Sequence, residues 1–323
     1  MILRRLKAIW KPELYHGWGR RKRFFEGWYY KIVSINQKNA FAFIPGIAMD
    51  ENGLKQAFIQ VLDGKNLKSN FIKFSFDDFK ANPLKHDLSI GGNRFTLNSI
   101  ELNLSEIKGK LVFRNLIPWS KSLFSPGIMG PFSFLPFMEC YHGILSMDHT
   151  ISGELIVGDK KIDFEKGRGY IEKDWGYSFP LGYIWMQSNH FSKRNISFKF
   201  SVAKIPLKSF SFIGFIAGIW IENKLIEFTT YNFSKLKKCS VSKFEVIIEM
   251  ENGNYHLSVK AHRAESTKLA APIHGFMDSR IEESMNSIIE LVLVDKKNNQ
   301  TIIKDKGSSA CVEVAGKYDL LIC

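Results

Sequence analysis

The sequence predicts an all-β protein made of two tandem antiparallel β-barrel domains, and three observations lead to that prediction. Aromatic residues make up 14% of the 323-residue chain, with 27 Phe, 10 Tyr and 7 Trp, and large rings suit pleated, half-buried surfaces. From about residue 25 onward, short runs alternate with period two between turn signals, whereas 3.6-residue periodicity is scarce. A tryptophan-bearing pattern around Trp28 recurs around Trp185, about half a chain later.

The alternating runs are expected to pair as hairpins. The strongest signal is Asn252-Gly253, which is typical of a type I′ turn and lies between the strand candidates 246–251 and 255–259. The exception is residues 278–290, where one short helix is expected.

The two halves of the chain are expected to share one topology. Two phenylalanines follow Trp28 at the same offsets at which two phenylalanines follow Trp185, namely Phe41 and Phe43, and Phe198 and Phe200. Roughly eight to ten strands in each half would suit a closed or nearly closed up-and-down barrel of the lipocalin kind, which encloses one apolar ligand cavity. The alternative is a pair of β-sandwiches with solid cores. The expected domains are a basic arm at residues 1–17, a first barrel at 18–178 with a proline-rich apolar segment at 115–138, and a second barrel at 179–323.

The net charge of +13 is concentrated near the N-terminus. Residues 1–23 contain eight Lys or Arg and a single acid, Glu13. This arm either contacts phosphates or an anionic membrane surface, or forms a solvated tail. Nucleic acid is not expected as a partner, because basic residues elsewhere are interspersed with acids and no zinc-finger or helix-turn-helix pattern occurs.

Several other classes of protein are excluded. The four cysteines are scattered without a C-x-x-C pair, which argues against a zinc ribbon, a redox dithiol and a disulfide scaffold. The N-terminus lacks the apolar region of a signal peptide. The longest uncharged stretches, residues 122–138 and 210–221, are broken by prolines or too short to span a bilayer, which takes about 20 apolar residues. The expectation is a cytoplasmic protein, soluble or peripheral to a membrane, without a signal peptide or transmembrane helix.

A first candidate site lies in the run from Arg23 to Tyr30. Strand alternation puts Glu26, Trp28 and Tyr30 on one face. The Glu26 carboxylate either forms an ion pair with a nearby arginine or lies in an apolar cavity, where its pKa would rise.

A second candidate site lies between Gly169 and Gly176. Tyr170, Glu172 and Asp174 share one strand face, and residues 171, 173 and 175 share the other. Two ionised carboxylates that close repel each other, so one of them should retain a proton and could act as a general acid. The alternative is a hydrated strand end.

A third candidate site, residues 139–149, contains two histidines and two acids. His142, Ser146 and Asp148 fall on one face, whereas Glu139 and His149 fall on the other, so no metal ion is expected. The sequence has no Gly-x-Ser-x-Gly elbow and no glycine-rich phosphate loop, so neither a serine nucleophile nor a nucleotide cofactor is expected.

Several motifs together resemble those of the tocopherol cyclase family, in the same order along the chain from residue 15 to about residue 316. They are Tyr15-His16-Gly17 with Phe24-Phe25-Glu26-Gly27-Trp28-Tyr29, Glu172-Lys173-Asp174-Trp175-Gly176 with Ser178-Phe179-Pro180, Trp185-x-Gln187-x-Asn189, Thr267–Pro272 and Ala310–Gly316.

This resemblance implies two lipocalin-like domains and kinship with carotenoid hydratases, whose tryptophan-and-acid motif is similar to Asp174-Trp175-Gly176. Both chemistries begin by adding a proton to a trisubstituted isoprenoid double bond, which gives a tertiary carbocation. In a cyclase a phenol oxygen of the same molecule captures the cation, and in a hydratase water does. The implied activity is that of a tocopherol cyclase, an intramolecular lyase of the isomerase class, acting on a prenylated (phytyl) quinol as in vitamin E biosynthesis. Aromatic walls would stabilise the cation by about 0.5–2 kcal/mol each.

For this chemistry we expect Asp174 to be the proton donor, with Glu172 and Glu26 as alternatives. The expected cavity walls and head-group contacts are Trp28, Tyr30, His142, Trp175, Trp185, Gln187 and Asn189. No cofactor is expected, and the partner would be a hydrophobic small molecule. The alternative function is a non-catalytic lipocalin-like carrier of an isoprenoid, lipid or pigment, which is favoured if all three carboxylates are solvated or ion-paired.

Overall fold

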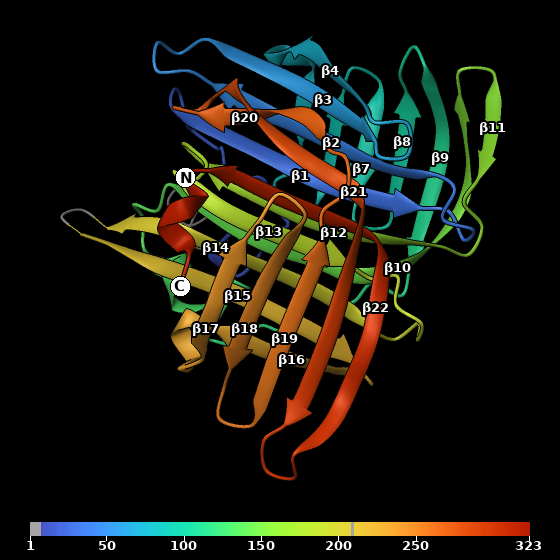
Figure 1. Cartoon of the computed structure of the whole chain (residues 1–323). Coiled ribbons are helices and arrows are strands. Elements are labelled where there is room, and N and C mark those ends of the chain that lie inside the picture. Colours follow the sequence, from blue (N-terminus) through green and yellow to red (C-terminus); the bar gives the residue numbers. More distant parts are fainter. Residues whose placement is uncertain (1–7, 208–209) are drawn as a thin grey trace. The chain divides into compact units, whose positions relative to one another are not determined.

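A computed structural model describes residues 8–207 and 210–323, and these residues are almost entirely antiparallel β-strand (Figure 1). The chain divides into two compact units, and its strands form two sheets. The first unit extends to Phe179 and also includes Leu269–Arg280, and the second consists of Pro180–Lys268 and Ile281–Cys323. The predicted fold class, all-β with two antiparallel sheets, is confirmed. Arg4, Arg5 and Lys7 of the expected basic arm lie outside the described residues.

The first sheet has twelve strands in the order β4-β3-β2-β1-β12-β10-β9-β8-β7-β6-β5, with β11 beside β10. Its strands are β1 Phe24–Val33, β2 Ala40–Met49, β3 Lys55–Asp63, β4 Lys68–Ser75, β5 Phe79–Ala81, β6 Asp87–Ile90, β7 Asn93–Thr96, β8 Ser99–Asn103, β9 Ile107–Arg114, β10 Cys140–Val157, β11 Lys160–Asp163 and β12 Gly167–Gly176. Most pairs are hairpin neighbours, whereas β1 pairs with β12 at the far end of the unit. Among the described ladders none joins β4 to β5, so the expected barrel is not closed by hydrogen bonds.

The second sheet has ten strands in the order β16-β15-β14-β13-β22-β21-β19-β18-β17, with β20 beside β21. Its strands are β13 Gly182–Ser188, β14 Ser197–Leu207, β15 Phe210–Ile221, β16 Lys224–Thr229, β17 Lys235–Val241, β18 Glu245–Glu251, β19 Tyr255–His262, β20 Thr267–Ile273, β21 Phe276–Asp295 and β22 Gln300–Gly316. The order repeats that of the first sheet, because β13 lies between the next strand, β14, and the last, β22, as β1 lies between β2 and β12. This shared order supports the predicted common topology.

Trp28 and Trp185, the tryptophans of the sequence repeat, do not occupy equivalent positions in the two sheets. Tyr30 lies opposite Phe43 in the first sheet, whereas Met186 lies opposite Phe200 in the second, which is a difference of one residue in register. A shift of one residue moves a side chain to the other face of its sheet. Trp28 therefore packs in the first core, while Trp185 is on the face of β13 opposite the second core.

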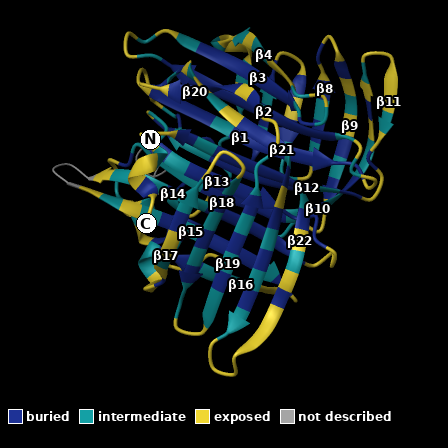
Figure 2. Ribbon diagram, in the orientation of Figure 1, coloured by how far each residue is buried: buried dark blue, intermediate teal, exposed yellow. Residues whose placement is uncertain are grey.

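The central strands of the first sheet are buried on both faces. Figure 2 shows this as continuous dark blue along β1 and β2, in contrast to β18, where buried and partly exposed residues alternate. The first core is rich in phenylalanine and includes Phe41, Phe43, Phe95 and Phe113. The charged groups Glu26, Lys31, Glu172 and Lys173 on β1 and β12 consequently lie away from water, whereas the side chain of Asp174 is 26% exposed.

The helical elements of the described residues are short 3₁₀ turns. They are η1 Phe76–Asp78, η2 Gly130–Phe134, η3 Thr230–Asn232 and η4 Tyr318–Leu321. Within the described ranges, therefore, no helix combines the length and the apolar character needed to cross a membrane.

Two local predictions need correction. The helix expected at residues 278–290 is wrong, because this segment belongs to β21, whose register shifts around Ser284 and Ser287 interrupt the period-two pattern. The hairpin at Asn252-Gly253 is confirmed as the β18–β19 connection. Its turn is not type I′, since Gly253 does not have the positive φ that this turn requires.

Candidate active site

The predicted acids lie on two adjacent strands, β1 and β12, but on two different faces. Glu26 is directly opposite Trp175, and Trp28 is opposite Lys173. These four side chains point toward the first core. Asp174 alternates with them along β12 and therefore lies on the other face, opposite His142 of β10.

On the core face, Glu26 and Lys173 form a fully buried ion pair. Lys173 Nζ is 2.5 Å from Glu26 Oε1, and both side chains are completely inaccessible to solvent. The backbone N–H of His16 donates to both oxygens of the same carboxylate, at 2.8 and 3.0 Å. Burial raises the pKa of Glu26, but the Lys173 ammonium and the His16 hydrogen bonds outweigh it, so the pKa lies below its usual value. Burial lowers the pKa of Lys173 to about 8, against the opposing effect of Glu26.

The imidazole of His16 is neutral and completes the shell around Lys173. Its Nδ1 is 2.7 Å from Lys173 Nζ and its Nε2 is 3.1 Å from the carbonyl oxygen of Ala8. An ammonium can only donate, so Nδ1 accepts and the Nε2–H donates to Ala8. Burial and the Lys173 charge both lower the pKa of His16, which agrees with this assignment.

Lys173 fixes the N-terminal segment to the sheet. Its Nζ donates to the carbonyl oxygen of Pro12 at 3.0 Å and to that of Leu14. It also lies 4.7 Å from the ring centroid of Trp28 and 4.7 Å from that of Trp175.

The N-terminal segment comes close to β10 because residue 143 is a glycine. A Cβ added at Gly143 would lie only 2.8 Å from the Cβ of Pro12. The missing side chain therefore leaves room for Pro12 to pack directly against the strand.

These contacts decide between the two interpretations of Glu26, an ion pair with an arginine or a carboxyl with a raised pKa in an apolar cavity. The partner is Lys173 rather than an arginine, and the pKa is lowered rather than raised. Glu26 is therefore ionised near neutral pH and is a poor proton donor.

Trp28 and Tyr30 are core residues, held by hydrogen bonds. The Trp28 indole donates to the carbonyl oxygen of Glu13 at 3.3 Å, and the Tyr30 hydroxyl is 2.5 Å from Nε2 of His86. Burial lowers the pKa of His86 to about 3, so its ring is neutral. Neither Trp28 nor Tyr30 belongs to the wall of the cavity beside them.

This cavity has a volume of about 460 Å³, within the range of about 300–1,000 Å³ that small-molecule sites occupy. The N-terminal segment forms one wall, the proline-rich segment forms another, and the adjoining ends of β10 and β12 complete it. Its aromatic lining consists of Tyr15, His16, Trp18, Phe24, Phe134, Phe137, Tyr141, His142, Trp175 and Tyr177. The ring of Trp175 is nearly parallel to that of His16 at 4.2 Å and to that of Tyr141 at 5.5 Å.

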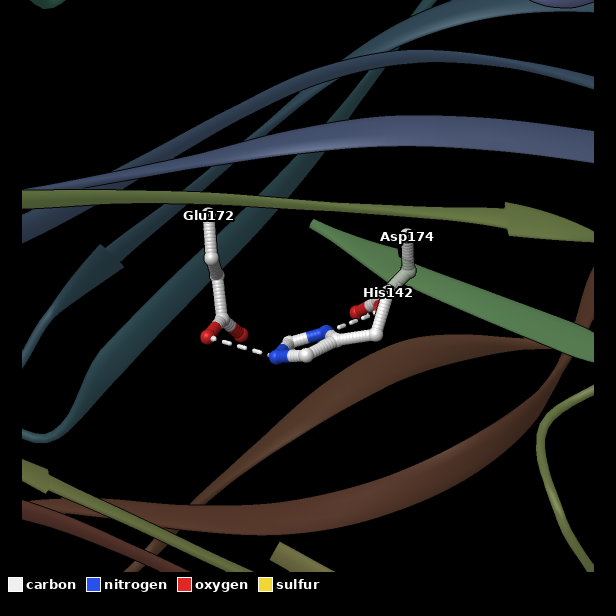
Figure 3. A group of neighbouring side chains, drawn as sticks. All are labelled: His142, Glu172 and Asp174. Atoms are coloured by element: carbon white, nitrogen blue, oxygen red, sulfur yellow. Dashed lines mark hydrogen bonds and ion pairs between the residues drawn. The ribbon is translucent and has the colours of Figure 1, made fainter. Parts of the chain in front are cut away.

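On the opposite face, His142 lies between the two predicted acids (Figure 3). Its Nδ1 is 2.6 Å from Asp174 Oδ1, and its Nε2 is 3.6 Å from Glu172 Oε2. The hydroxyl of Tyr170 donates to Glu172 Oε2 at 2.5 Å. Glu172 and Asp174 were expected to interact directly, but the imidazole of His142 lies between them. The ring of Trp175 lies on the other face of β12 from the Asp174 carboxyl. Two hydrogen-bonded pairs, His142 with Asp174 and Tyr170 with Glu172, thus lie side by side, and the 3.6 Å contact between His142 and Glu172 that separates them is too long for a hydrogen bond.

His142, Glu172 and Asp174 also converge closely enough to be considered as metal ligands. One donor atom from each lies within 4.8 Å of the others. The histidines and acids of β10 were expected to lie on opposite faces of the strand and so not to bind one metal ion. That argument does not apply to this group, because Glu172 and Asp174 come from β12. Within this group, His142 Nδ1 and Asp174 Oδ1 are in direct contact at 2.6 Å, as a short hydrogen bond.

The remaining polar residues of β10 do not join His142. The register of β10 shifts on both sides of Ser146, and Asp148 forms an ion pair with Arg168, whose Nε is 3.0 Å from Asp148 Oδ1. His149 is buried against the ring of Phe113, and burial lowers its pKa to about 3.

The other predicted contact residues belong to the second unit. Trp185 and Gln187 lie on the face of β13 opposite the second core, and Asn189 follows the strand. All three are buried. The buried Lys199 lies directly opposite Gln187 in β14.

The sequence analysis missed His16, Lys173 and Lys199. His16 and Lys173 each lie inside a motif that was recognised, so the motifs contained the signal. It was overlooked because a lysine between two acids is ordinarily a solvated residue.

Comparisons with known proteins agree with this architecture. Residues 110–316 match the sequence model of a family described as tocopherol cyclase-like. The chloroplastic tocopherol cyclase of Zea mays is 22% identical, in an alignment that covers 94% of this chain and 77% of the relative. The crystal structure of CghA with Sch210972 has a TM-score of 0.58 at 8% identity, covering 91% of this chain and 88% of that one. The kievitone hydratase of Nectria haematococca has a TM-score of 0.52 at 12% identity, covering 92% and 89%.

Replacing Lys173 should strongly destabilise the first unit. In Lys173→Met the Glu26 carboxylate stays buried without its ammonium, which costs about 3–5 kcal/mol. Denaturant unfolding measures the loss. The double variant Glu26→Gln/Lys173→Met should lose clearly less than the sum of the two single variants. Additive losses would mean that the two groups do not interact.

Glu26 should also make the protein sensitive to acid. Its folded pKa lies below the ordinary 4.5, so above pH 4.5 both states are ionised and the stabilisation is complete. As the pH falls below 4.5, the unfolded chain takes up the proton first, and the free energy of unfolding decreases. Glu26→Gln should show a smaller decrease over this range in unfolding curves recorded at several pH values. An unchanged decrease would assign it to other carboxylates.

Proposed function

Since the chain belongs to the tocopherol cyclase-like family, we propose that it is an enzyme that protonates a prenyl double bond of a prenylated (phytyl) quinol and closes a chromanol ring. The observation that carries this proposal is the position of His142. It contacts both Asp174 and Glu172, and it is also part of the wall of the aromatic cavity. His142 thus connects the two acids to the cavity, whose wall includes neither Asp174 nor Glu172.

The proposed reaction is an isomerisation and needs no other reactant. Asp174 gives its proton to the less substituted carbon of the double bond, which leaves a tertiary carbocation on the other carbon. The phenol oxygen of the same molecule donates a lone pair to that carbon and forms the ring C–O bond. The phenolic proton returns to the Asp174 carboxylate, so the acid is regenerated.

The neighbouring residues have separate roles in this proposal. His142 holds the Asp174 carboxyl at 2.6 Å, and its Nε2 faces Glu172 at 3.6 Å, which keeps a proton available to the pair. The Tyr170 hydroxyl orients Glu172. The ring of Trp175 and its parallel neighbours, His16 and Tyr141, line the cavity on the other face of the sheet, where they bind the apolar part of the ligand and exclude water.

A non-catalytic carrier of an isoprenoid, lipid or pigment is the second candidate. The contacts of the three candidate acids favour it, because Glu26 is neutralised by Lys173, and Glu172 and Asp174 both lie within ion-pair distance of His142. A carrier needs the cavity but not the acids, so the two candidates differ in what Asp174 and His142 do.

Replacing Asp174 should abolish turnover. Asp174→Asn keeps the size and most hydrogen bonding of the side chain but removes the acidic proton, and loss of a general acid typically costs about 10²–10⁴-fold in rate. Asp174→Glu should retain part of the activity. The assay follows chromanol formation from a phytyl quinol by liquid chromatography, and Asp159→Asn, an exposed acid in the β10–β11 turn, is the matched control.

The outcomes of this assay separate the candidates. Full activity of Asp174→Asn would transfer the role of the acid to Glu172. A product heavier by one water would indicate a hydratase. If the native protein converts no prenyl quinol, the carrier is the better assignment.

The cavity should retain an apolar ligand whether or not it is turned over. Mass spectrometry of lipid extracts from the purified native protein should detect an isoprenoid or a related lipid. Trp175→Ala should reduce its amount severalfold, because the central ring of the wall is lost, whereas Asp174→Asn should leave it nearly unchanged. Equal retention by native protein and Trp175→Ala would place the ligand elsewhere.

A further inference from the structure

We propose that the rim of this cavity is a docking surface for an anionic lipid bilayer, so that the cavity opens toward the membrane. The rim consists of the exposed apolar residues Trp10, Leu123, Phe124, Phe134 and Phe137 and the basic run Arg20–Arg23. The inference concerns the surface alone and does not depend on which compound the cavity holds or on its turnover.

The apolar residues of the rim form one group. The rings of Trp10 and Phe134 pack edge to face at 5.3 Å, and the Trp10 indole donates to the carbonyl oxygen of Leu123 at 3.2 Å. Phe134 and Phe137 belong to the cavity wall. The side chains of Leu123 and Phe124 are 69% and 76% exposed. Large apolar groups gathered at an opening are typical of an interaction surface rather than of ordinary exposed residues.

Basic residues share the cavity wall with the apolar ones. Arg20 and Arg23 line it together with Phe134 and Phe137. Two acids near the rim are engaged, since Glu51 pairs with Arg23 at 2.8 Å and Glu13 with Lys121 at 3.3 Å. Within the described part of the chain, no ion pair involves Arg21 or Lys22. The rim is therefore positively charged.

This combination fits a membrane better than a protein partner. Tryptophan and phenylalanine beside lysine and arginine are the residues that bury their rings at the headgroup level and attract anionic lipids. The proline-rich segment reinforces the arrangement, because it folds as the short turn η2 Gly130–Phe134 and loops, and so holds its rings at the surface.

Vesicle sedimentation tests the docking surface directly. The full chain should bind vesicles of equal parts phosphatidylcholine and phosphatidylserine, and bind vesicles of phosphatidylcholine alone much more weakly. Arg21→Gln/Lys22→Gln should lower the affinity for the anionic vesicles by about fivefold per charge, and this loss should shrink at high salt. Leu123→Ser/Phe124→Ser should lower it at least tenfold at every salt concentration, because burial of apolar surface is not screened.

The matched control is Ile35→Ser/Ile156→Ser, which removes two large apolar side chains that are 53% and 49% exposed at the ends of β1 and β10 opposite the cavity. It should bind as the native chain does. Equal binding by the rim variant and the control would overturn the proposal. So would a rim variant that changes the oligomeric state in light scattering without vesicle binding, since the occupant would then be a second copy of the chain. Charge variants are preferable to deletion of residues 1–11, because that deletion also removes Ala8 and Ile9 from the cavity wall.

Discussion

The buried ion pair between Glu26 and Lys173 is the interaction on which the first unit depends. Each ion taken from water costs several kcal/mol, and this is offset only when every donor and acceptor finds a partner. The Lys173 ammonium therefore needs not only Glu26 but also the carbonyl oxygens of Pro12 and Leu14. These carbonyls belong to the segment that forms one wall of the cavity. The requirement to satisfy a buried charge thus fixes the wall, and the cavity exists because the ion pair does.

The same ion pair divides the chemistry between the two faces of β12. Alternation points Lys173 and Trp175 into the core, and Glu172 and Asp174 away from it. On the core side a carboxylate meets an ammonium and is held ionised. On the other side two carboxylates meet one imidazole, which can accept a proton from either. The proposed acid chemistry therefore belongs to the face that lacks the lysine, although both faces belong to one short strand.

Period-two alternation allowed much of this arrangement to be predicted. It correctly grouped Glu26 with Trp28, and Glu172 with Asp174, because the spacing of side chains along a strand is a local property. It could not identify which group faces the core or what lies opposite, since these depend on pairing with strands far away in sequence. The position of His142 follows from the β10–β12 register, which β10 changes at two bulges. The sequence repeat also wrongly aligned Trp28 with Trp185, for the same reason. The strand register differs by one residue between the two sheets, and the amino-acid composition does not reveal such a difference.

The proline-rich segment shows how the cavity and the surface are linked. Its prolines break any long strand or helix, and part of the segment, residues 133–138, covers the cavity as a wall. Such a wall has two sides, and Phe134 and Phe137 are at once part of the cavity wall and exposed. In water this exposed apolar area costs about 25 cal/mol per Å², whereas against a bilayer it does not. A ligand apolar enough to fill the cavity is also dissolved in that same phase. The proline-rich wall therefore has the cavity on one side and an exposed apolar surface on the other. Both depend on the same physical property, which is the preference of aromatic rings for a water-free environment.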